Sequence, residues 1–396
     1  MVKWVENTIP KSDCSDSMSL MNVETAEKIR KFYKSFPQYD TTPLVSLDNL
    51  AKELGVGGIH IKDESYRFGL NAFKVLGATF AIASHIAQKL GISVWELDYN
   101  TLPEATAKLG EFTFFAATDG NHGRAVAWAA RELGQKAVVY MAKGCSEVRL
   151  DHIKREGAEA KISDLNYDDT VRYIADLAAK TPNSVVVQDT AWEGYVDIPA
   201  WIMQGYGVIA LEASEQLDEK NVMPTHMLLQ AGVGGFTAAI QGFFSNKYND
   251  NAPKSFIVEP SVADCFYRSA AKGDGSTVHV GGDMKTIMAG LSCGEPSTLA
   301  WDILKNKANY FANIGDKEAA RAMRVLGAPV KGDTRVISGE SGASSMGLLL
   351  ELLSNNDLRE LRDHAGIGKD SHFLLISTEG DTYPEMYRDI VWNGSY

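Results

Sequence analysis

The chain has 396 residues, 45% hydrophobic and 23% charged, which is enough to bury a large core and to form two domains. A formal net charge of -12, with no patch rich in lysine and arginine, argues against nucleic-acid binding. No stretch is long and apolar enough to cross a membrane, and the first residues lack a signal-peptide core. We therefore expect a cytoplasmic protein without membrane contact.

Short β-rich runs alternate with helical segments, which predicts an α/β protein with mostly parallel strands. Helical apolar spacing follows Lys74, and helices are also expected over 121–133, 147–156 and 344–353. A glycine follows 121–133 and 147–156 where a helix C-cap is expected. The expected strands are, in chain order, Phe112–Ala116, Lys136–Tyr140, Ala158–Ile162, Ser184–Gln188, Thr225–Gln230, Ser255–Val258, Thr334–Ile337 and His372–Ile376.

Two domains are expected from this order. Residues 83–223 have the pattern of a self-contained set of βαβ units and form the predicted small domain. Residues 1–82 and 224–396 then form a larger, discontinuous domain. Each is expected to have three layers, α/β/α. Ligands of such sheets bind beyond the carboxyl ends of the strands, so the cleft between the domains is the predicted site.

Lys74 is the first candidate for chemistry. It lies in Asn71-Ala72-Phe73-Lys74 and opens an apolar helix, where burial favours loss of its proton. An unprotonated lysine amine can bond covalently to an aldehyde. A lone lysine of this kind usually extends to solvent. The hypothesis therefore depends on further segments that suit a phosphorylated pyridine aldehyde.

A polar segment, Thr118-Asp119-Gly120-Asn121-His122, follows an expected strand and opens an expected helix. Each of its polar residues is, taken singly, a candidate helix N-cap. Taken together they suit a substrate carboxylate at a helix N-terminus. We expect Asn121 to hold a phenolic oxygen and Asp119 to be a candidate base. The expected substrate contacts are Thr118, Asp119, Gly120 and His122.

A glycine-rich segment, Gly232-Val233-Gly234-Gly235, follows an apolar strand and precedes a helix. Glycines let backbone N–H groups fold around a phosphate, and the helix dipole favours the anion. The segment is no Walker loop, and Thr237 replaces the third glycine of the dinucleotide fingerprint. Glu259 nevertheless ends the next strand as a ribose-binding acid does, which keeps a nicotinamide oxidoreductase open as an alternative.

Two strand ends near the C-terminus carry small hydroxyl and acidic residues. We expect Glu340 and Ser377 near a nitrogen of a cofactor ring, although turn chemistry alone also explains such residues. Asp189, which ends the strand over 184–188, is a weaker candidate for binding a substrate cation.

The four cysteines, Cys14, Cys145, Cys265 and Cys293, include no CxxC pair, and the histidines lack metal-binding spacing. No metal site is therefore expected, and free thiols are the default in the cytosol. A bridge between Cys265 and Cys293 stays open because both lie in loop-like sequence.

These segments together resemble the fold-type II pyridoxal-phosphate enzymes, such as threonine and serine dehydratases, threonine synthases and tryptophan synthase β chains. The resemblance covers nearly the whole chain, from the early lysine through the Asn-His-Gly and glycine-rich loops to a hydroxyl residue near the C-terminus. The dehydratase pattern has serine where this chain has Asp119. With that residue, and with Lys62-Asp63-Glu64 before Lys74, the sequence resembles the diaminopropionate ammonia-lyases.

The resemblance implies elimination of ammonia from D- and L-2,3-diaminopropionate to give pyruvate, in a homodimer. Because the two enantiomers present the α-hydrogen on opposite faces, one base cannot easily serve both. We expect Lys74 to serve one enantiomer and Asp119 to serve the D-substrate. The resemblance also implies pyridoxal 5'-phosphate on Lys74, with Asn121 at the ring oxygen, Gly232, Val233, Gly234 and Gly235 at the phosphate, and Ser377 or Thr378 at the pyridine nitrogen.

Three other functions stay open at this point. A serine or threonine dehydratase would share the cofactor and the fold. A nicotinamide enzyme would leave Lys74 and the Asp119 segment unexplained. A catalytically silent metabolite-binding protein would have the same cofactor fold without turnover.

Overall fold

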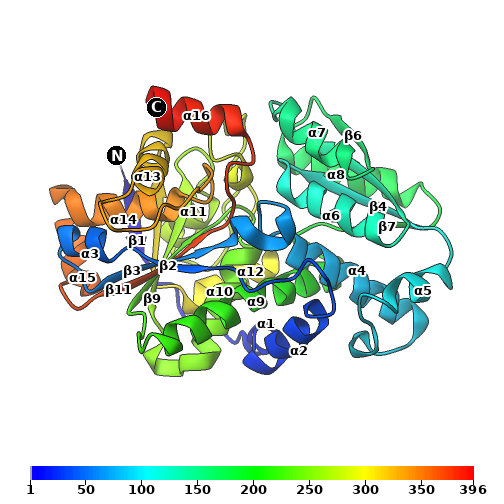
Figure 1. Ribbon diagram of the computed structural model, residues 1–396, viewed down its shortest axis with the longest axis horizontal. Helices are drawn as coiled ribbons and strands as arrows, with labels where there is room; N and C mark the ends of the chain where they lie inside the picture. The colour runs from blue at the N-terminus through cyan, green and yellow to red at the C-terminus, as the bar shows by residue number, and fades with distance from the viewer. Residues whose placement is uncertain (1) are drawn as a thin grey trace.

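Eleven strands form two separate sheets in the computed structural model, which describes residues 2–396 (Figure 1). The larger sheet has seven strands in the order β1-β10-β9-β8-β11-β3-β2. Its five inner strands are parallel, and its edge strands, β1 and β2, are antiparallel to their neighbours. The strands are β1 (Lys3–Glu6), β2 (Leu44–Ser46), β3 (Gly58–Asp63), β8 (His226–Gln230), β9 (Lys254–Pro260), β10 (Tyr310–Ile314) and β11 (His372–Ser377).

The smaller sheet has four parallel strands in the order β6-β5-β4-β7. These are β4 (Thr113–Thr118), β5 (Lys136–Met141), β6 (Glu159–Ile162) and β7 (Ser184–Val186). The expected α/β class with mostly parallel strands is therefore confirmed.

Helices cover both faces of the larger sheet because its inner strands are apolar on both faces. In β8, Met227 and Leu229 belong to one core and Leu228 to the other, as the two-residue period of a strand requires. The first core is completed by α2 (Val23–Tyr33), α4 (Val75–Leu90), α9 (Asp197–Glu219), α10 (Gly235–Tyr248), α11 (Cys265–Lys272) and α12 (Thr298–Lys307). The second is completed by α3 (Asp48–Leu54), α13 (Asp316–Gly327), α14 (Ser344–Ser354), α15 (Arg359–Ala365) and α16 (Pro384–Asn393).

The smaller sheet is also covered on both faces. Helices α6 (Asn121–Glu132) and α7 (Glu147–Arg155) join the core that contains Phe114 and Val139. Helix α8 (Tyr167–Ala179) packs over the opposite face, against Phe115. The short helices α1 (Ser15–Ser19) and α5 (Leu102–Ala107) lie at the periphery (Figure 1).

Seven of the expected strands are present within two residues of their expected ends, and the three helices bounded in advance, α6, α7 and α14, are also present. The strand expected over Thr334–Ile337 is wrong: this segment is irregular, and its Val336 N–H donates to the carbonyl of Leu326. Strand β10 was not expected, because its polar Asn313 breaks the apolar pattern. The Asn313 amide is buried and donates to Asp264 at 2.7 Å.

The domain limits stay a prediction. All four strands of the smaller sheet lie inside residues 83–223, and the strands of the larger sheet lie outside that range. However, α9 packs against α2, α4 and α10 of the larger unit. A boundary near residue 190 therefore agrees with these contacts better than one at residue 223. Helix α9 is the longest helix in residues 2–396, and neither it nor any other helix there is apolar enough for its length to span a membrane.

Candidate active site

A cavity lies where the carboxyl ends of β4, β8 and β11 face one another. Parallel strands place their carboxyl ends at one edge of each sheet, which is where ligands of α/β proteins bind. The lining contains almost every polar segment that the sequence singled out: Lys74, Thr118 to His122, Asp189, Gly232 to Gly235 and Thr378.

Lys74 is the residue immediately before α4, and the chain that leads to it is unusually constrained. Phe68 and Asn71 both have positive φ, 52° and 61°, in the left-handed region that costs energy for side chains other than glycine. Asn71 is held by hydrogen bonds to the loop after β11: its amide donates to Asp381 at 3.1 Å, and its carbonyl accepts from Gly380 N at 3.0 Å. The Lys74 backbone is thereby fixed beside Thr378, whose carbonyl accepts from Phe73 N at 3.2 Å.

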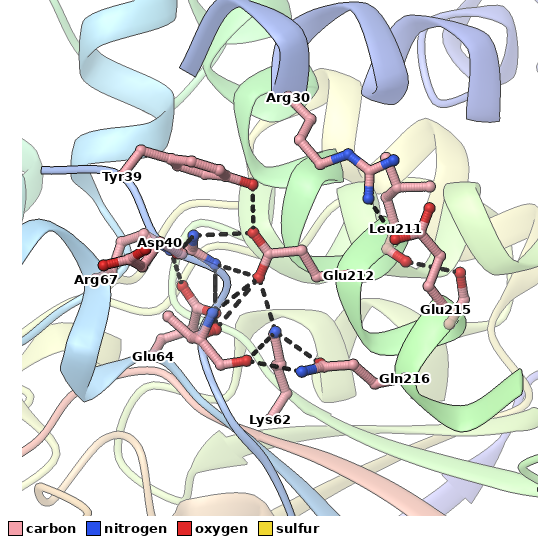
Figure 2. A network of polar contacts seen from close by, with 12 residues as sticks. Arg30, Tyr39, Asp40, Lys62, Glu64, Arg67, Leu211, Glu212, Glu215 and Gln216 are labelled. Atoms are coloured by element: carbon pink, nitrogen blue, oxygen red, sulfur yellow. Dashed lines mark hydrogen bonds and ion pairs between the residues drawn. The ribbon is translucent and has the colours of Figure 1, made fainter. Parts of the chain in front are cut away.

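A buried ion cluster holds the part of this segment that contains Glu64 and Arg67 (Figure 2). The cluster comprises Lys62, Glu64, Arg67 and Glu212, whose side chains are fully buried. Arg67 donates to both glutamates at 2.8 to 2.9 Å, and Lys62 pairs with Glu212 at 2.7 Å. The cluster therefore ties β3 and the turn that leads to Lys74 onto α9.

The sequence suggested apolar surroundings for the Lys74 amine. In the structure this amine instead forms an ion pair with Asp189. Although burial raises the pKa of Asp189, the Lys74 ammonium holds that pKa well below its usual range. His122 and a hydrogen bond from Tyr167 act in the same direction. Asp189 is therefore a permanent anion that orients the lysine, rather than an independent contact for a cation.

The helix-cap explanation for Asp119 does not apply. Thr118 Oγ1 accepts from the N–H groups of Gly120 at 2.8 Å and Gly123 at 3.0 Å, so it satisfies the start of α6. Asp119 instead turns into the cavity, where its one hydrogen-bond donor within residues 2–396 is the Cys145 thiol, at 3.7 Å. Burial and the nearby Asp189 raise the pKa of Asp119 to about 7, although Arg149 and Lys74 oppose this.

Asn121 and His122 are both committed to neighbours. The Asn121 amide donates to Glu379 Oε2 at 2.5 Å. His122 Nε2 lies 2.7 Å from the carbonyl of Val187, and burial lowers the pKa of this histidine. His122 Nδ1 is buried without a hydrogen-bond partner in the described chain.

The glycine-rich segment forms a tight turn between β8 and α10. Gly234 has φ +92°, and a Cβ on it would lie 2.4 Å from Phe266 Cζ, so only glycine fits. A Cβ on Gly235 would lie 3.2 Å from the carbonyl of Asp189. The first N–H groups of a helix have no partner inside it, and the first residues of α10, Gly235 to Thr237, line the cavity, which is an arrangement that suits an anion.

Two expected ring contacts are placed elsewhere. Ser377 does not line the cavity, and its hydroxyl donates to Ser338 Oγ at 2.8 Å. Glu340 also lies behind the lining, where it pairs with Arg149. Thr378 does line the cavity, and its Oγ1 accepts from Gln230 Nε2 at 2.9 Å.

Sequence reasoning missed several lining residues. Arg149 lies in the first turn of α7 and Tyr167 is the first residue of α8, and both are outside the segments that the sequence singled out for chemistry. Glu379 lies within a segment that the sequence did single out, next to Thr378. The set also includes Gln230, Gly290, Leu291, Cys293 and Ser341.

Two further expectations concern Glu259 and the cysteines. Glu259 accepts from the N–H groups of Phe266 at 2.8 Å and Tyr267 at 2.7 Å, so it stabilises the start of α11 rather than facing a ribose. Cys265 and Cys293 are free buried thiols, and Cys265 Sγ lies 3.8 Å from the carbonyl of Cys293.

Comparison with known proteins places the chain in a class. The family model for pyridoxal-phosphate dependent enzymes matches residues 36–364. The chain therefore belongs to the pyridoxal-phosphate dependent enzymes, with the fold-type II architecture that the sequence resemblance implied.

Within that class the similarity extends over the full length to proteins called diaminopropionate ammonia-lyase. Such a protein from Salmonella typhimurium strain LT2 is 49% identical, covering 100% of this chain and 98% of its own. The holo diaminopropionate ammonia lyase of Escherichia coli superposes with a TM-score of 0.93 at 46% identity, covering 100% and 97%. The Escherichia coli enzyme in complex with D-serine gives the same score and identity, covering 100% and 98%.

The cavity fits pyridoxal 5'-phosphate. Lys74 supplies an amine for the aldehyde, and the glycine turn supplies N–H groups and close approach for the phosphate. Three buried polar atoms of the lining, Gln230 Oε1, His122 Nδ1 and Arg149 Nε, have no hydrogen-bond partner within residues 2–396. Buried polar atoms normally have hydrogen-bond partners, so these three atoms are suited to form hydrogen bonds with a polar ligand.

Proposed function

We propose that this chain eliminates ammonia from both D- and L-2,3-diaminopropionate and yields pyruvate, using pyridoxal 5'-phosphate on Lys74. One observation carries the proposal: Asp119, freed from helix capping by Thr118, faces the same cavity as Lys74. The names of the full-length relatives support the same substrate.

The lining supports a place for the cofactor. Lys74 would bond to its aldehyde, the turn from Gly232 to Gly235 would bind its phosphate, and Asn121 and Thr378 would contact its ring. When bound, the pyridine ring supplies a sink for the negative charge left by removal of the α-proton. Thr118, Gly120 and His122 are the proposed contacts of the substrate carboxylate, beside the N-terminus of α6.

The protein's own contribution is proton transfer from two sides. Lys74 takes the α-proton of the L-substrate, and Asp119 takes that of the D-substrate. The β-amino group leaves as ammonia after receiving a proton from the enzyme, because an amide anion is a very poor leaving group. Released 2-aminoacrylate then hydrolyses to pyruvate and a second ammonia.

Pyruvate release from purified protein, with D- and L-2,3-diaminopropionate assayed separately, tests the proposal. D- and L-serine are the matched controls, since they differ only in the leaving group. We expect rapid release from both diaminopropionates and little from serine. Rapid release from serine alone would assign the protein to the serine dehydratases. That alternative is favoured by one observation, the D-serine complex of the Escherichia coli relative.

We also propose that the enzyme is cytoplasmic and homodimeric. Cytoplasmic location agrees with four free thiols, and a homodimer agrees with the family resemblance. Light scattering on the purified chain tests the second point, with a mass twice that of the chain as the expected result.

A further inference from the structure

Asp119 lacks a cationic partner although an arginine passes close to it. A Cβ on Gly120 would lie 3.0 Å from Arg149 Cδ, so the Arg149 stem packs against the backbone beside Asp119. Yet no ion pair joins Arg149 to Asp119 within the described chain.

The Arg149 guanidinium is turned toward the larger unit instead. Its Nη2 lies 3.4 Å from Glu340 Oε2 and 3.4 Å from Thr382 Oγ1. The side chains of Arg149 and Glu340 are 8% and 3% exposed, so this pair is shielded from water. Arg149 Nε is buried without a hydrogen-bond partner in residues 2–396, and Glu340 is the one carboxylate in that range that forms an ion pair with this arginine. Glu379, which lines the cavity, acts on Arg149 over a longer distance.

The direction of that arginine matters for chemistry. A cation within about 4 to 6 Å lowers a carboxyl pKa by about 1 to 3 units. A carboxylate paired in this way is a weak base near neutral pH. Asp119, without such a pair, has a pKa raised by burial to about 7.

Other groups also face Asp119. Lys74 and Asp189 lie across the cavity as a mutually neutral pair, and the Cys145 thiol is hydrogen bonded to it. Tyr167 and Cys293 line the same cavity, and burial raises the pKa of each well above its usual range, so both are neutral. Arg149 is therefore the cation near Asp119 that is held by a residue outside the cavity lining, Glu340.

We propose that Glu340 is a positioning residue: by holding Arg149 away, it keeps Asp119 unpaired and able to accept the α-proton of the D-substrate. This inference rests on the proposed function. It assigns to Glu340 a role outside the cavity lining, in place of the ring contact expected from the sequence.

The test is the pH profile of kcat/KM for each enantiomer. In Glu340→Gln, Arg149 is released toward Asp119, so the acid limb for the D-substrate should move down by about one pH unit. D-substrate turnover at pH 8 should fall about threefold to tenfold, since the base is weaker. The L-substrate profile should stay within twofold.

Two further variants and one control distinguish a positioning role of Glu340 from a general loss of structure. Arg149→Gln removes the cation, so the D-substrate acid limb should move up, opposite to Glu340→Gln. Glu340→Asp keeps the charge and should restore most of the wild-type profile. Glu156→Gln is the matched control, because Glu156 is also buried and paired with arginines, at 3.0 Å from Arg124, but lies off the cavity. Its profile should not move.

Three results would overturn the inference: shifts of Glu340→Gln and Arg149→Gln in the same direction, no shift in either variant, or equal shifts for both enantiomers. The proposed function would still stand in each case, provided that the wild-type protein turns over both enantiomers. Absence of wild-type turnover with both enantiomers would overturn both. Melting temperatures and cofactor absorbance of each variant identify any that fails to fold or to load.

Discussion

The buried ion cluster in Figure 2 and the cavity beside it handle buried charge in opposite ways. In the cluster, Lys62 and Arg67 meet Glu64 and Glu212, all fully buried, and each charge has opposite charges within hydrogen-bond reach. In the cavity, the only hydrogen-bond donor to Asp119 from residues 2–396 is a thiol, and polar atoms of three lining residues have no partner within the same range. The comparison indicates that buried charges with complete ion pairing hold the fold in place. Polar groups without partners can instead bind a ligand or exchange a proton.

The protonation of the two regions differs accordingly. Although burial raises the pKa of Glu212, Arg67 and Lys62 outweigh it and lower that pKa to about 2. Burial raises the pKa of Asp119 and of Glu340 to about 7, because their cationic neighbours compensate only in part. Glu212 is thus charged throughout the physiological pH range, whereas Asp119 and Glu340 titrate within it.

The largest effect should come from the cavity. Lys74→Ala should reduce turnover of both enantiomers by at least about 10³-fold, because it removes the cofactor's covalent anchor and one base. Borohydride reduction should then no longer fix the cofactor to the chain. Lys108→Ala, at an exposed lysine, is the control and should behave as wild type. Covalent labelling of the Lys74→Ala protein would place the anchor elsewhere.

Breaking the cluster should affect stability rather than selectivity. Arg67→Met leaves the buried Glu64 without its cationic partner and Glu212 with Lys62 alone, so it should lower the free energy of unfolding by about 3 to 5 kcal/mol. Arg172→Met removes a half-exposed arginine that pairs with Asp169 and should cost less than about 1 kcal/mol. Urea unfolding at saturating cofactor measures both. Equal small losses would show that the cluster does not stabilise the fold.

The pH dependence of stability should have opposite sign in the two regions. Asp119 has a raised pKa, so its contribution is complete below its unfolded value of about 4 and is lost as the pH rises toward 7. Glu212 has a lowered pKa, so its contribution is complete above about pH 4.3 and is lost as the pH falls toward 2.

Asp119→Asn should consequently stabilise the protein relative to wild type as the pH rises from 4 to 7. The gain is at most about 4 kcal/mol, and less where water enters the cavity. Glu212→Gln should show the reverse, with a deficit that shrinks toward pH 3. Urea unfolding across this range measures both variants, and parallel curves would contradict the distinction.

The smallest effect should come from the glycine turn. Gly234→Ala should weaken cofactor binding about tenfold, because alanine is strained by about 1 to 2 kcal/mol at positive φ and meets Phe266. Gly273→Ala is the matched control: its φ is +76° with no atom within 4 Å of the added Cβ. Titration with the cofactor should show weaker binding in Gly234→Ala alone.

Local sequence signals predicted the parts of the site that depend on glycine turns and strand ends. Lys74 was found because it opens an apolar helix, and Thr118 to His122 and the glycine turn were found because each follows a strand and opens a helix. Ser377 and Thr378 were not separable, because successive strand residues face opposite sides and the register decides which one reaches the cavity. Arg149 lies in the first turn of α7 and Tyr167 is the first residue of α8, and only tertiary packing brings these two helix starts to the cavity.

The fold was predicted on the same basis, with a similar limit. Apolar runs marked most inner strands, but β3 contains Lys62 and Asp63 and does not have the pattern of a buried strand. Its charge is tolerated because Glu212, from a helix more than a hundred residues away, neutralises Lys62. Such long-range pairing leaves no local trace in the sequence.

The most direct test compares pyruvate release from wild type and Asp119→Asn with each enantiomer of 2,3-diaminopropionate. If Asp119 is the base for the D-substrate, D-turnover should fall by about 10² to 10⁴-fold while L-turnover stays within a few-fold. Equal loss with both enantiomers, or no loss with either, would contradict the division of labour between Lys74 and Asp119.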